Sequence, residues 1–335
     1  MNRNAKLKEF FTSSQMIIVY IMIVLCIAIG SANAAFVDFS TVVTIARASL
    51  VTLIFAICEM LVIVSGGIDV SFPAIGCAAM YIPISFMIDN NIDSVIFAFV
   101  FAIVIGLIFG VINALLISTL QIPPLIATLG MSSFISGGLV GIWGATQLSI
   151  LPSSVDAVFR SYLFTVVSHV NGNEYPLTSL IIIPIVLAVG IWALLKYTTL
   201  GRGIFAVGGN RSAAAVAGFN VKRIQYFVYI FVGGMTGIAA MTQCILNRAA
   251  SSINLMGSEM MVIAAVVLGG TRLTGGHGTV SGTILGVLLI SLIQNNLIML
   301  GVPTHWQTFI LGLLIVVGTS ITSLKAKAAS SQSKV

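Results

Sequence analysis

The sequence predicts an all-α integral membrane protein with about ten transmembrane helices, on three grounds. Hydrophobic residues make up 58% of the 335 residues, and charged residues make up only 7%. The apolar residues gather in stretches of roughly 17 to 25 residues, which is the length of helix that crosses a bilayer. These stretches are continuously apolar, whereas the wall of a membrane β-barrel alternates apolar and polar residues.

The whole chain, residues 1–335, is expected to form a single transmembrane domain. The expected spans cover residues 15–36, 42–64, 73–88, 94–118, 124–145, 177–196, 225–246, 258–270, 279–300 and 304–323. The first span follows three basic residues and could imitate a signal peptide, but its length favours a retained helix.

The distribution of charge orients these spans. All but three of the fifteen Lys and Arg residues fall in segments on one side of the membrane; the exceptions are Arg47, Arg160 and Arg248. Because short basic segments stay in the cytoplasm, we expect both termini and the basic loop at about 197–224 to be cytoplasmic. The net charge of +6 then reflects orientation and contact with anionic membrane lipid, and no nucleic-acid binding is expected.

Metal and catalytic sites are not expected in this chain. The four cysteines all lie within expected spans and lack the short paired spacing of zinc ligands. The three histidines lie in separate segments, so they form no pair at metal-ligand spacing. A Gly-x-Ser-x-Gly element, which would favour hydrolytic chemistry, does not occur.

Glycine spacing predicts close packing between helices. Two glycines four residues apart share one face of a helix and let a neighbouring backbone approach closely. The pairs at this spacing are Gly106 with Gly110, Gly137 with Gly141, and Gly233 with Gly237.

Two short segments resemble each other and indicate weakly duplicated halves. Residues 65–71 read Ser-Gly-Gly-Ile-Asp-Val-Ser, and residues 268–274 read Leu-Gly-Gly-Thr-Arg-Leu-Thr. Each follows one apolar span and precedes another, on the cytoplasmic side in the expected orientation. Internal repeats of this kind are common in transporters.

The longest connection outside the membrane covers about residues 146–176, and we expect it to be periplasmic. Its turn-forming residues include the run Asn-Gly-Asn-Glu at 171–174. The segment could cap the outer end of the bundle or receive a partner, and a solvated connector is an equally good interpretation.

The basic loop at 197–224 is the most informative segment. Glycine-rich turns precede Ser212, which we expect to cap a helix of about one turn at Ala213–Ala217, ended by Gly218 in the left-handed conformation. A helix this short does not persist alone in water and needs a surface to pack on. A groove on another protein would suit its small side chains, although an amphipathic connector at the membrane surface has the same composition.

Four motifs in this order resemble one known family. They are Val64–Ser71, Pro123–Gly130, the glycine-rich loop from Gly201 to Gly218, and Gly269–Thr279. Together they resemble the permease subunits of ATP-binding-cassette importers for ribose, xylose, arabinose, galactose and related sugars, over nearly the whole chain. The resemblance implies a bacterial inner-membrane permease that acts with a second permease subunit, cytoplasmic ATPase subunits and a periplasmic or lipid-anchored substrate-binding protein.

Under this resemblance the short helix is the coupling helix that sits in a cleft of the ATPase. The coupling residues would be Gly201, Arg202, Gly209, Asn210, Ser212, Ala213, Ala214, Ala217 and Gly218. The chain has no Gly-x-x-x-x-Gly-Lys-Ser/Thr phosphate loop, so we expect ATP and Mg to bind the partner ATPase. This chain is then not an enzyme and binds no cofactor itself.

A path for a sugar needs amides, hydroxyls and aromatic faces without fixed charge. The candidates for the substrate pathway are Asn113, Thr128, Gln243, Asn247, Asn295 and Trp306. Each side chain could equally form a hydrogen bond that holds two helices together. The sequence does not identify the sugar.

Three other functions stay open. Glu59 or Asp69 could bind a proton or sodium ion in an ion-coupled secondary transporter, although a hydrogen-bonded helix contact also explains Glu59. Related permeases for nucleosides or branched-chain amino acids share much of this architecture. A structural or signalling membrane subunit is the third.

Overall fold

The computed structural model describes residues 14–301, 303, 306, 309, 310, 312, 313 and 316. Within this part of the chain, seven helical segments are long and apolar enough to cross a membrane. They contain α2 (Ser14–Ala32), α3 (Phe39–Val64), α4 (Phe72–Asp89), α5 (Val95–Ala114), α6 (Pro124–Trp143), α8 (Ile182–Tyr197) and α11 (Val221–Asn247). These helices confirm the first seven expected spans and a mostly helical membrane fold.

The expected eighth and ninth spans are shorter than predicted. Helix α12 covers Glu259–Leu268, and α13 covers Val280–Asn296 before a 3₁₀ turn, η4 (Leu297–Leu300). Ten residues of α-helix rise only about 15 Å, which is half the hydrocarbon thickness of a bilayer. Most of the expected tenth span, 304–323, lies outside the described residues, so the count of ten and the duplicated halves stay predictions.

Helix α3 occupies the centre of the bundle and packs against α8, α11, α12 and α13. The most extensive contact between two helices joins α5 and α11, and glycines lie along it. A Cβ added to Gly110 would lie 2.7 Å from the carbonyl oxygen of Tyr229, and one on Gly233 would lie 2.8 Å from Cα of Gly110. The close packing predicted from the glycine pairs of α5 and α11 is therefore confirmed.

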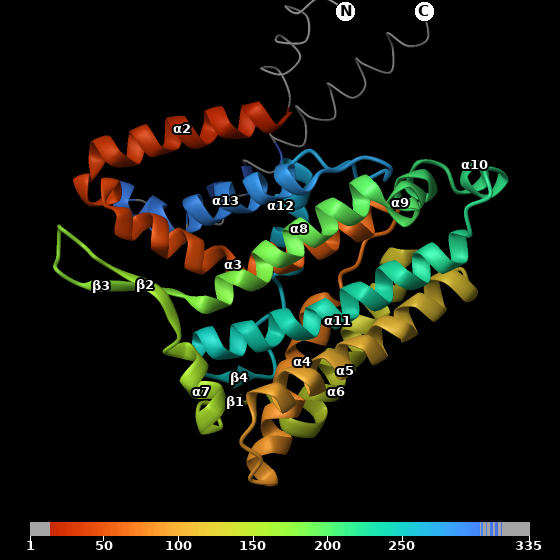
Figure 1. The fold of residues 1–335 in the computed structure, drawn as a ribbon, viewed down its shortest axis with the longest axis horizontal. Helices are drawn as coiled ribbons and strands as arrows, with labels where there is room; N and C mark the ends of the chain where they lie inside the picture. Colours follow the sequence, from red (N-terminus) through yellow and green to blue (C-terminus); the bar gives the residue numbers. More distant parts are fainter. Residues whose placement is uncertain are drawn as a thin grey trace, which may run out of the picture.

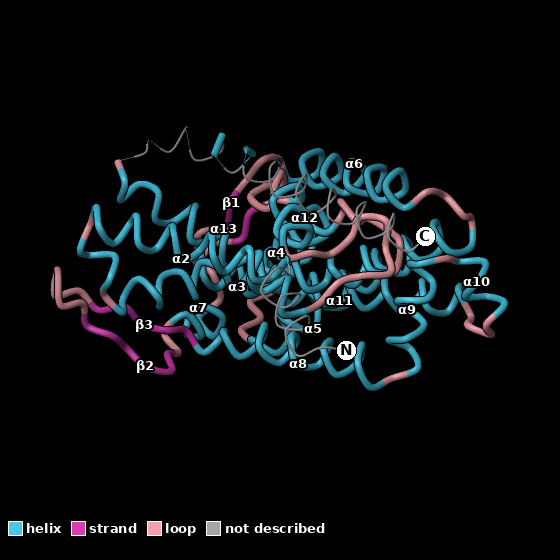
Figure 2. Tube along the Cα trace, turned by 90° about the horizontal axis from the view of Figure 1, so that it is seen from above, coloured by secondary structure: helices cyan, strands magenta, loops and turns pink. Residues whose placement is uncertain are grey.

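The third glycine pair behaves differently. Gly137 and Gly141 lie on an exposed face of α6, and a Cβ added to either would meet no atom within 4 Å in the described part of the chain. Figures 1 and 2 both show α6 at the margin of the bundle. The prediction of a close neighbour for this pair is not met by any residue that the structure describes.

The remaining elements lie at the two ends of the bundle. At one end are α9 (Thr199–Gly209) and α10 (Arg211–Val216), and at the other are α7 (Ser153–Phe159) and a hairpin of β2 (Tyr162–Val167) and β3 (Glu174–Thr178). Figures 1 and 2 show this separation from two directions. We call these ends the α10 end and the α7 end.

The smallest elements connect these parts. A 3₁₀ turn, η1 (Ala34–Val37), joins α2 to α3, a π-helical turn, η2 (Leu115–Thr119), extends α5, and a 3₁₀ turn, η3 (Ser179–Ile181), leads into α8. Strand β1 (Gln147–Leu148) pairs antiparallel with β4 (Ala250–Ser251), which follows α11.

Three aspartates tie the segment 146–176 to the bundle. Asp38, which caps α3, accepts hydrogen bonds from the Ser168 hydroxyl and the His169 amide. Asp93, just before α5, accepts from the Ser153 hydroxyl and the Ser154 amide. The third, Asp156, is bound by arginines. This segment is therefore a folded cap at the α7 end, and we call it the cap.

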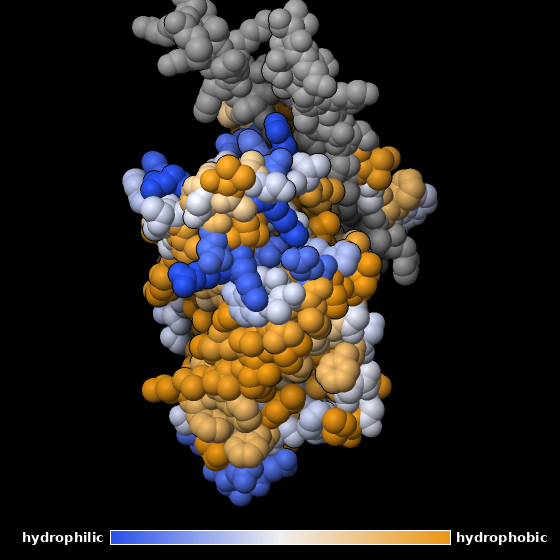
Figure 3. Space-filling view, turned by 90° about the vertical axis from the view of Figure 1, so that its right-hand side faces the viewer, coloured by the Kyte–Doolittle hydropathy of each residue, from blue (hydrophilic) through white to orange (hydrophobic). Residues whose placement is uncertain are grey.

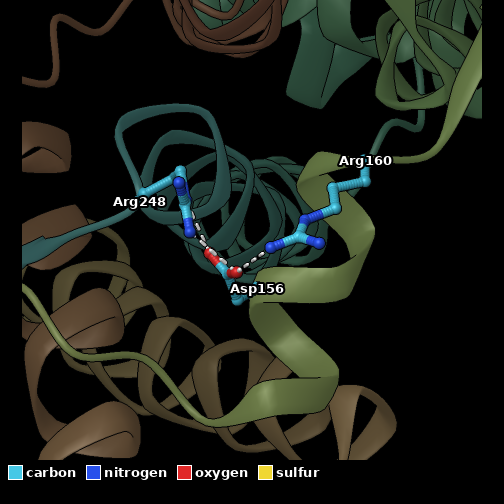
Figure 4. A network of polar contacts seen from close by, with 3 residues as sticks. All are labelled: Asp156, Arg160 and Arg248. Carbon is cyan, nitrogen blue, oxygen red and sulfur yellow. Dashed lines mark hydrogen bonds and ion pairs between the residues drawn. The ribbon is translucent and has the colours of Figure 1, made fainter.

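The third aspartate makes the strongest ionic contact of the cap. Arg248, at the end of α11, donates to the two oxygens of Asp156 at 2.6 and 2.8 Å, and Arg160 lies 3.9 Å from the same carboxylate (Figure 4). Arg47, which falls inside the expected span 42–64, lies within α3, about two turns after its first residue. Its guanidinium and that of Arg248 lie 5.2 and 5.3 Å from the centre of the Phe159 ring.

The surface shows an apolar band between polar ends. In Figure 3, which faces the side that carries α10, hydrophilic residues gather at mid-height and at the lower tip, with hydrophobic residues continuous between them. A band of this kind suits lipid or an apolar partner, because hydrocarbon leaves no hydrogen-bond partners for exposed polar groups.

Candidate functional site

The α10 end is built from three capped helices. The Thr198 hydroxyl accepts a hydrogen bond from the Gly201 amide at the start of α9, and the Asn220 side chain accepts from the Arg223 amide at the start of α11. Between them, the Asn210 side chain accepts from the Ala213 amide at 3.0 Å. Each cap satisfies an amide that the first turn of a helix leaves without a partner.

The expected cap of the short helix is therefore wrong by two residues. Asn210 has the extended backbone of a cap, with φ of −160° and ψ of 111°, whereas Ser212 lies inside α10. Because Asn and Ser cap helices about equally well, composition alone did not distinguish them. The end of the helix agrees with the prediction: Gly218 has a φ of 87°, and its amide donates to the Ala215 carbonyl at 3.0 Å.

Helix α10 presents one apolar surface to solvent. Val216 is 91% exposed, and Ala213 and Ala217 are exposed on the same face, three and four residues apart. Ala214 was expected to join them, but it is 3% exposed and packs against its own chain. Val216 was not among the predicted coupling residues, although its spacing of three residues from Ala213 places it on this face.

The other expected coupling residues have different surroundings. Gly201 is buried where α8 turns into α9, and a Cβ there would lie 2.5 Å from Cα of Leu195. Arg202, Gly209 and Ser212 are exposed. The space around Gly209 is open, because an added Cβ would meet no described atom within 4 Å.

A chain of buried polar groups surrounds the turn between α3 and α4. Glu59 on α3 accepts a hydrogen bond from the Asp69 amide at 3.1 Å. Asp69 accepts from the Ser71 hydroxyl at 2.6 Å, and the Asn113 amide group on α5 donates to that hydroxyl at 2.8 Å. The turn is thus joined by side chains to both α3 and α5.

Thr128 extends this arrangement to α6. Its hydroxyl oxygen accepts from the Val70 amide at 3.2 Å. Glu59, Asn113 and Thr128 are each at most 1% exposed. The structure therefore brings Asn113 and Thr128, two candidates for the substrate pathway, to the same buried turn.

Three buried oxygens near this turn have no hydrogen-bond partner among the described residues. They are Oε2 of Glu59, Oδ1 of Asn113 and the hydroxyl of Tyr229. Tyr229, on α11, fits against the turn because residue 67 is glycine: a Cβ at that position would overlap its hydroxyl.

The other four candidates for the substrate pathway lie elsewhere. Gln243 is half-buried and Asn247 exposed, one turn apart near the α7 end of α11. Asn295 is half-buried and donates to the Ser291 carbonyl of its own helix at 2.8 Å. Trp306 is 57% exposed. Within the described residues, no hydrogen bond joins these four side chains to the buried turn.

Comparison with known proteins identifies the family. Residues 41–318 match the family described as the branched-chain amino acid transport system permease component. The fructose import permease of Bifidobacterium longum is 30% identical over 292 residues, covering 87% of this chain and 82% of that protein. The ribose import permease of Bacillus subtilis is 30% identical over 309 residues, covering 91% of each chain.

The name of a third relative also refers to a sugar. The D-allose transport system permease protein of Escherichia coli is 27% identical over 309 residues, covering 92% of this chain and 91% of that protein. No solved structure matches the chain. The helical bundle, the ordered motifs and the family match over most of the length agree: this chain belongs to the family of branched-chain amino acid transport system permease components.

Proposed function

We propose that this chain is the membrane-spanning subunit of an ATP-binding-cassette importer that moves a monosaccharide or a related small polar solute inward. The sugar class rests on the relatives, which are import permeases for fructose and ribose and a transport permease for D-allose. Transport proceeds by alternating access, and separate cytoplasmic ATPase subunits bind and hydrolyse ATP with Mg. The chain itself binds no cofactor.

One observation carries the coupling part of this proposal. Helix α10 projects at one end of the bundle (Figure 1) and exposes Val216, Ala213 and Ala217 on a single face. Val216, which is 91% exposed beside two alanines, packs little against the described part of the chain. It suits a shallow apolar groove on a soluble protein, which is how a short helix docks on a partner.

The caps around α10 explain how a push on it would be passed on. Asn210 joins α10 to the end of α9, and Asn220 begins α11, which runs for 27 residues toward the α7 end. Because these connections are short and closed by side-chain hydrogen bonds, the three helices can move little relative to one another. A displacement of α10 by the ATPase would therefore tilt or shift α9 and α11 as rigid elements.

The surroundings of α10 favour a cytoplasmic location, with both termini on the same side in the bacterial inner membrane. Basic residues are concentrated here at Lys196, Arg202, Arg211, Lys222 and Arg223. The Lys196 ammonium lies 4.8 Å from the ring centre of Trp192, and a Trp and Lys pair of this kind marks the membrane surface. Anionic lipid is a further partner of this surface.

Helix α6 supplies the candidate contact with a second permease subunit. Its exposed face carries Gly130, Ser133, Gly137 and Gly141 at helical spacing, with no described atom within 4 Å of a Cβ added to the three glycines. Two copies, or this chain and a similar one, would approach along this face, because small residues allow close contact in lipid. The cap, at the α7 end of the bundle, is the candidate contact for the binding protein.

Ion-coupled secondary transport is the second candidate, and one observation favours it. Oε2 of Glu59 is buried without a hydrogen-bond partner among the described residues, as a site for a proton or cation would be. Against it, Glu59 and Asp69 already accept hydrogen bonds from the turn that they hold.

A docking experiment tests the coupling proposal. Val216→Glu adds a charge to the exposed face of α10, and Ala215→Glu adds the same charge to an exposed position on the opposite face. We expect the ATPase to co-purify with the wild type and Ala215→Glu, but not with Val216→Glu. Equal recovery of the ATPase with both variants would contradict docking on this face.

A further inference from the structure

Three glycine-rich segments meet by backbone contact directly beside α10. They are the turn that follows α3, the last residues of α9, and the turn between α12 and α13. The Gly276 amide donates to the Val64 carbonyl at 2.9 Å. Gly208 packs against both residues, since an added Cβ would be 2.7 Å from the Gly276 nitrogen and would overlap the Val64 carbonyl.

A glycine from each of the two turns also contacts Gly208 at the end of α9. A Cβ added to Gly275 would lie 2.6 Å from the Gly208 carbonyl oxygen, and one on Gly66 would lie 3.3 Å from Cα of Gly208. Gly66 and Gly275 have φ values of 86° and 83°, which glycine adopts without strain. These two positions therefore need glycine for their backbone conformation as well as for space.

The two turns that flank Gly208 are those whose sequences echo each other. One joins α3 to α4 and the other joins α12 to α13. The first turn is also joined to α5 and α6. The Asn113 amide on α5 donates to the Ser71 hydroxyl, which donates to Asp69, and the Val70 amide donates to the Thr128 hydroxyl on α6. A displacement of the end of α9 would therefore reach all of these helices through this glycine contact.

We infer that Gly208 is the positioning residue through which α9 moves both turns together, and this inference rests on the proposed docking of an ATPase at α10. Contact between backbones has no side-chain rotamers to absorb a displacement, and close-packed interiors transmit strain. Movement of α9 shifts the Ser65–Ser71 turn, and with it the buried hydrogen bonds to Asn113 and Thr128. The inner end of the permease opens or closes as these helices separate or approach.

Two glycines with different surroundings provide a matched test. Gly208→Ala places a methyl group against the Val64 carbonyl, whereas Gly190→Ala, on the exposed face of α8, places the same group in open space. Each variant is assembled in vesicles with the ATPase and the binding protein. Three quantities are measured: ATPase recovered with the permease, ATP hydrolysis stimulated by the loaded binding protein, and solute imported per ATP.

We expect Gly208→Ala to retain the ATPase but to import roughly tenfold less solute per ATP, or less still, because a small misplacement of a rigid element is costly. Gly190→Ala should match the wild type in all three measurements. Unchanged import per ATP in Gly208→Ala would overturn the inference. Loss of ATPase recovery only in Val216→Glu, with import per ATP intact in Gly208→Ala, would leave the proposed function standing without this contact.

A second measurement applies if Gly208→Ala does not fold. Spin labels are placed at Ser212 on α10 and at Leu273 in the α12–α13 turn, both of which are exposed, in a variant without the four native cysteines. The two segments move as one body in this account, so the distance between the labels should be the same with and without ATP. A change in this distance larger than the spread of the label positions would overturn the inference.

Discussion

Two glycine-rich helix faces in this protein have the same spacing but different surroundings. Gly106 and Gly110 on α5 lie against Gly233 on α11, with backbone atoms where a larger side chain would be. Gly137 and Gly141 on α6 face no atom of the described chain. The same glycine spacing therefore accompanies close helix packing on α5 and α11 and, among the described residues, an open face on α6.

The same contrast separates the two ends of the bundle. At the α7 end, the carboxylates of Asp38, Asp93 and Asp156 hold the cap in place by hydrogen bonds within the chain. At the α10 end, Val216 is almost fully exposed. Surfaces that the chain closes itself should respond to mutation as a loss of stability, and surfaces left open should respond as a loss of assembly.

The largest effect is expected in the closed glycine face. Gly106→Val would force its side chain into the Gly233 carbonyl, so the α5–α11 contact must separate. We expect a loss of at least ~3 kcal/mol of folding stability, measured as a lower midpoint of thermal unfolding in detergent. Gly137→Val serves as the control, and an equal loss in that variant would remove the distinction between the two faces.

A smaller loss is expected at the buried turn. Thr128→Val keeps the side-chain volume but removes the oxygen that accepts from the Val70 amide. Leaving that buried amide without a partner should cost ~1 to 3 kcal/mol in the same unfolding measurement. Ser133→Ala, an exposed position on the same helix, is the control. A stability of Thr128→Val equal to the wild type would show that the turn is not held through α6.

The open face of α6 should respond by assembly alone. Gly137→Leu should leave the unfolding midpoint near that of the wild type and weaken pairing of two permease subunits by roughly tenfold, or ~1.4 kcal/mol. Cross-linking of the complex in vesicles measures the pairing. Val140→Leu, at the edge of the exposed face, is the control, and pairing that is unchanged in Gly137→Leu would exclude this face as the contact.

The smallest effect is expected for the stability of the cap as the pH of the medium is lowered. The Ser168 hydroxyl lowers the pKa of Asp38, the Ser153 hydroxyl lowers that of Asp93, and Arg248 lowers that of Asp156. A carboxylate with a lowered pKa stabilises the fold above its unfolded pKa of about 4, and this contribution is lost as the pH falls through the folded pKa. Protease resistance of the cap should therefore be constant from about pH 8 to 5 and fall below about pH 4. Detachment of the cap near neutral pH would contradict this assignment.

The membrane spans were predictable because their apolar runs are long and continuous. The cap was less predictable, since β1 pairs with β4 across about a hundred residues and each strand is too short to be recognised alone. The contact of Arg47 on α3 with the ring of Phe159 in the cap could not be predicted either, because the two residues are far apart in the sequence.

The candidate site shows the same division. The turn chemistry at Gly218 followed from its position after a short helix, and the φ of 87° agrees with it. Asn210 caps α10 in place of the predicted Ser212, and this difference depends on backbone angles that composition does not specify. The burial of Ala214 and of Asn113 depended on which helices pack against them, and so did the meeting of Gly208 with both turns.

Under the proposed function, import of a sugar by this permease is driven by ATP hydrolysis on a partner. Vesicles that contain the complete complex, with the loaded binding protein outside, allow uptake of a labelled monosaccharide to be measured with and without ATP enclosed. We predict uptake that requires enclosed ATP and persists when ionophores abolish the proton and sodium gradients. Uptake that continues without ATP and stops when those gradients are abolished would contradict the claim and favour an ion-coupled transporter built on Glu59.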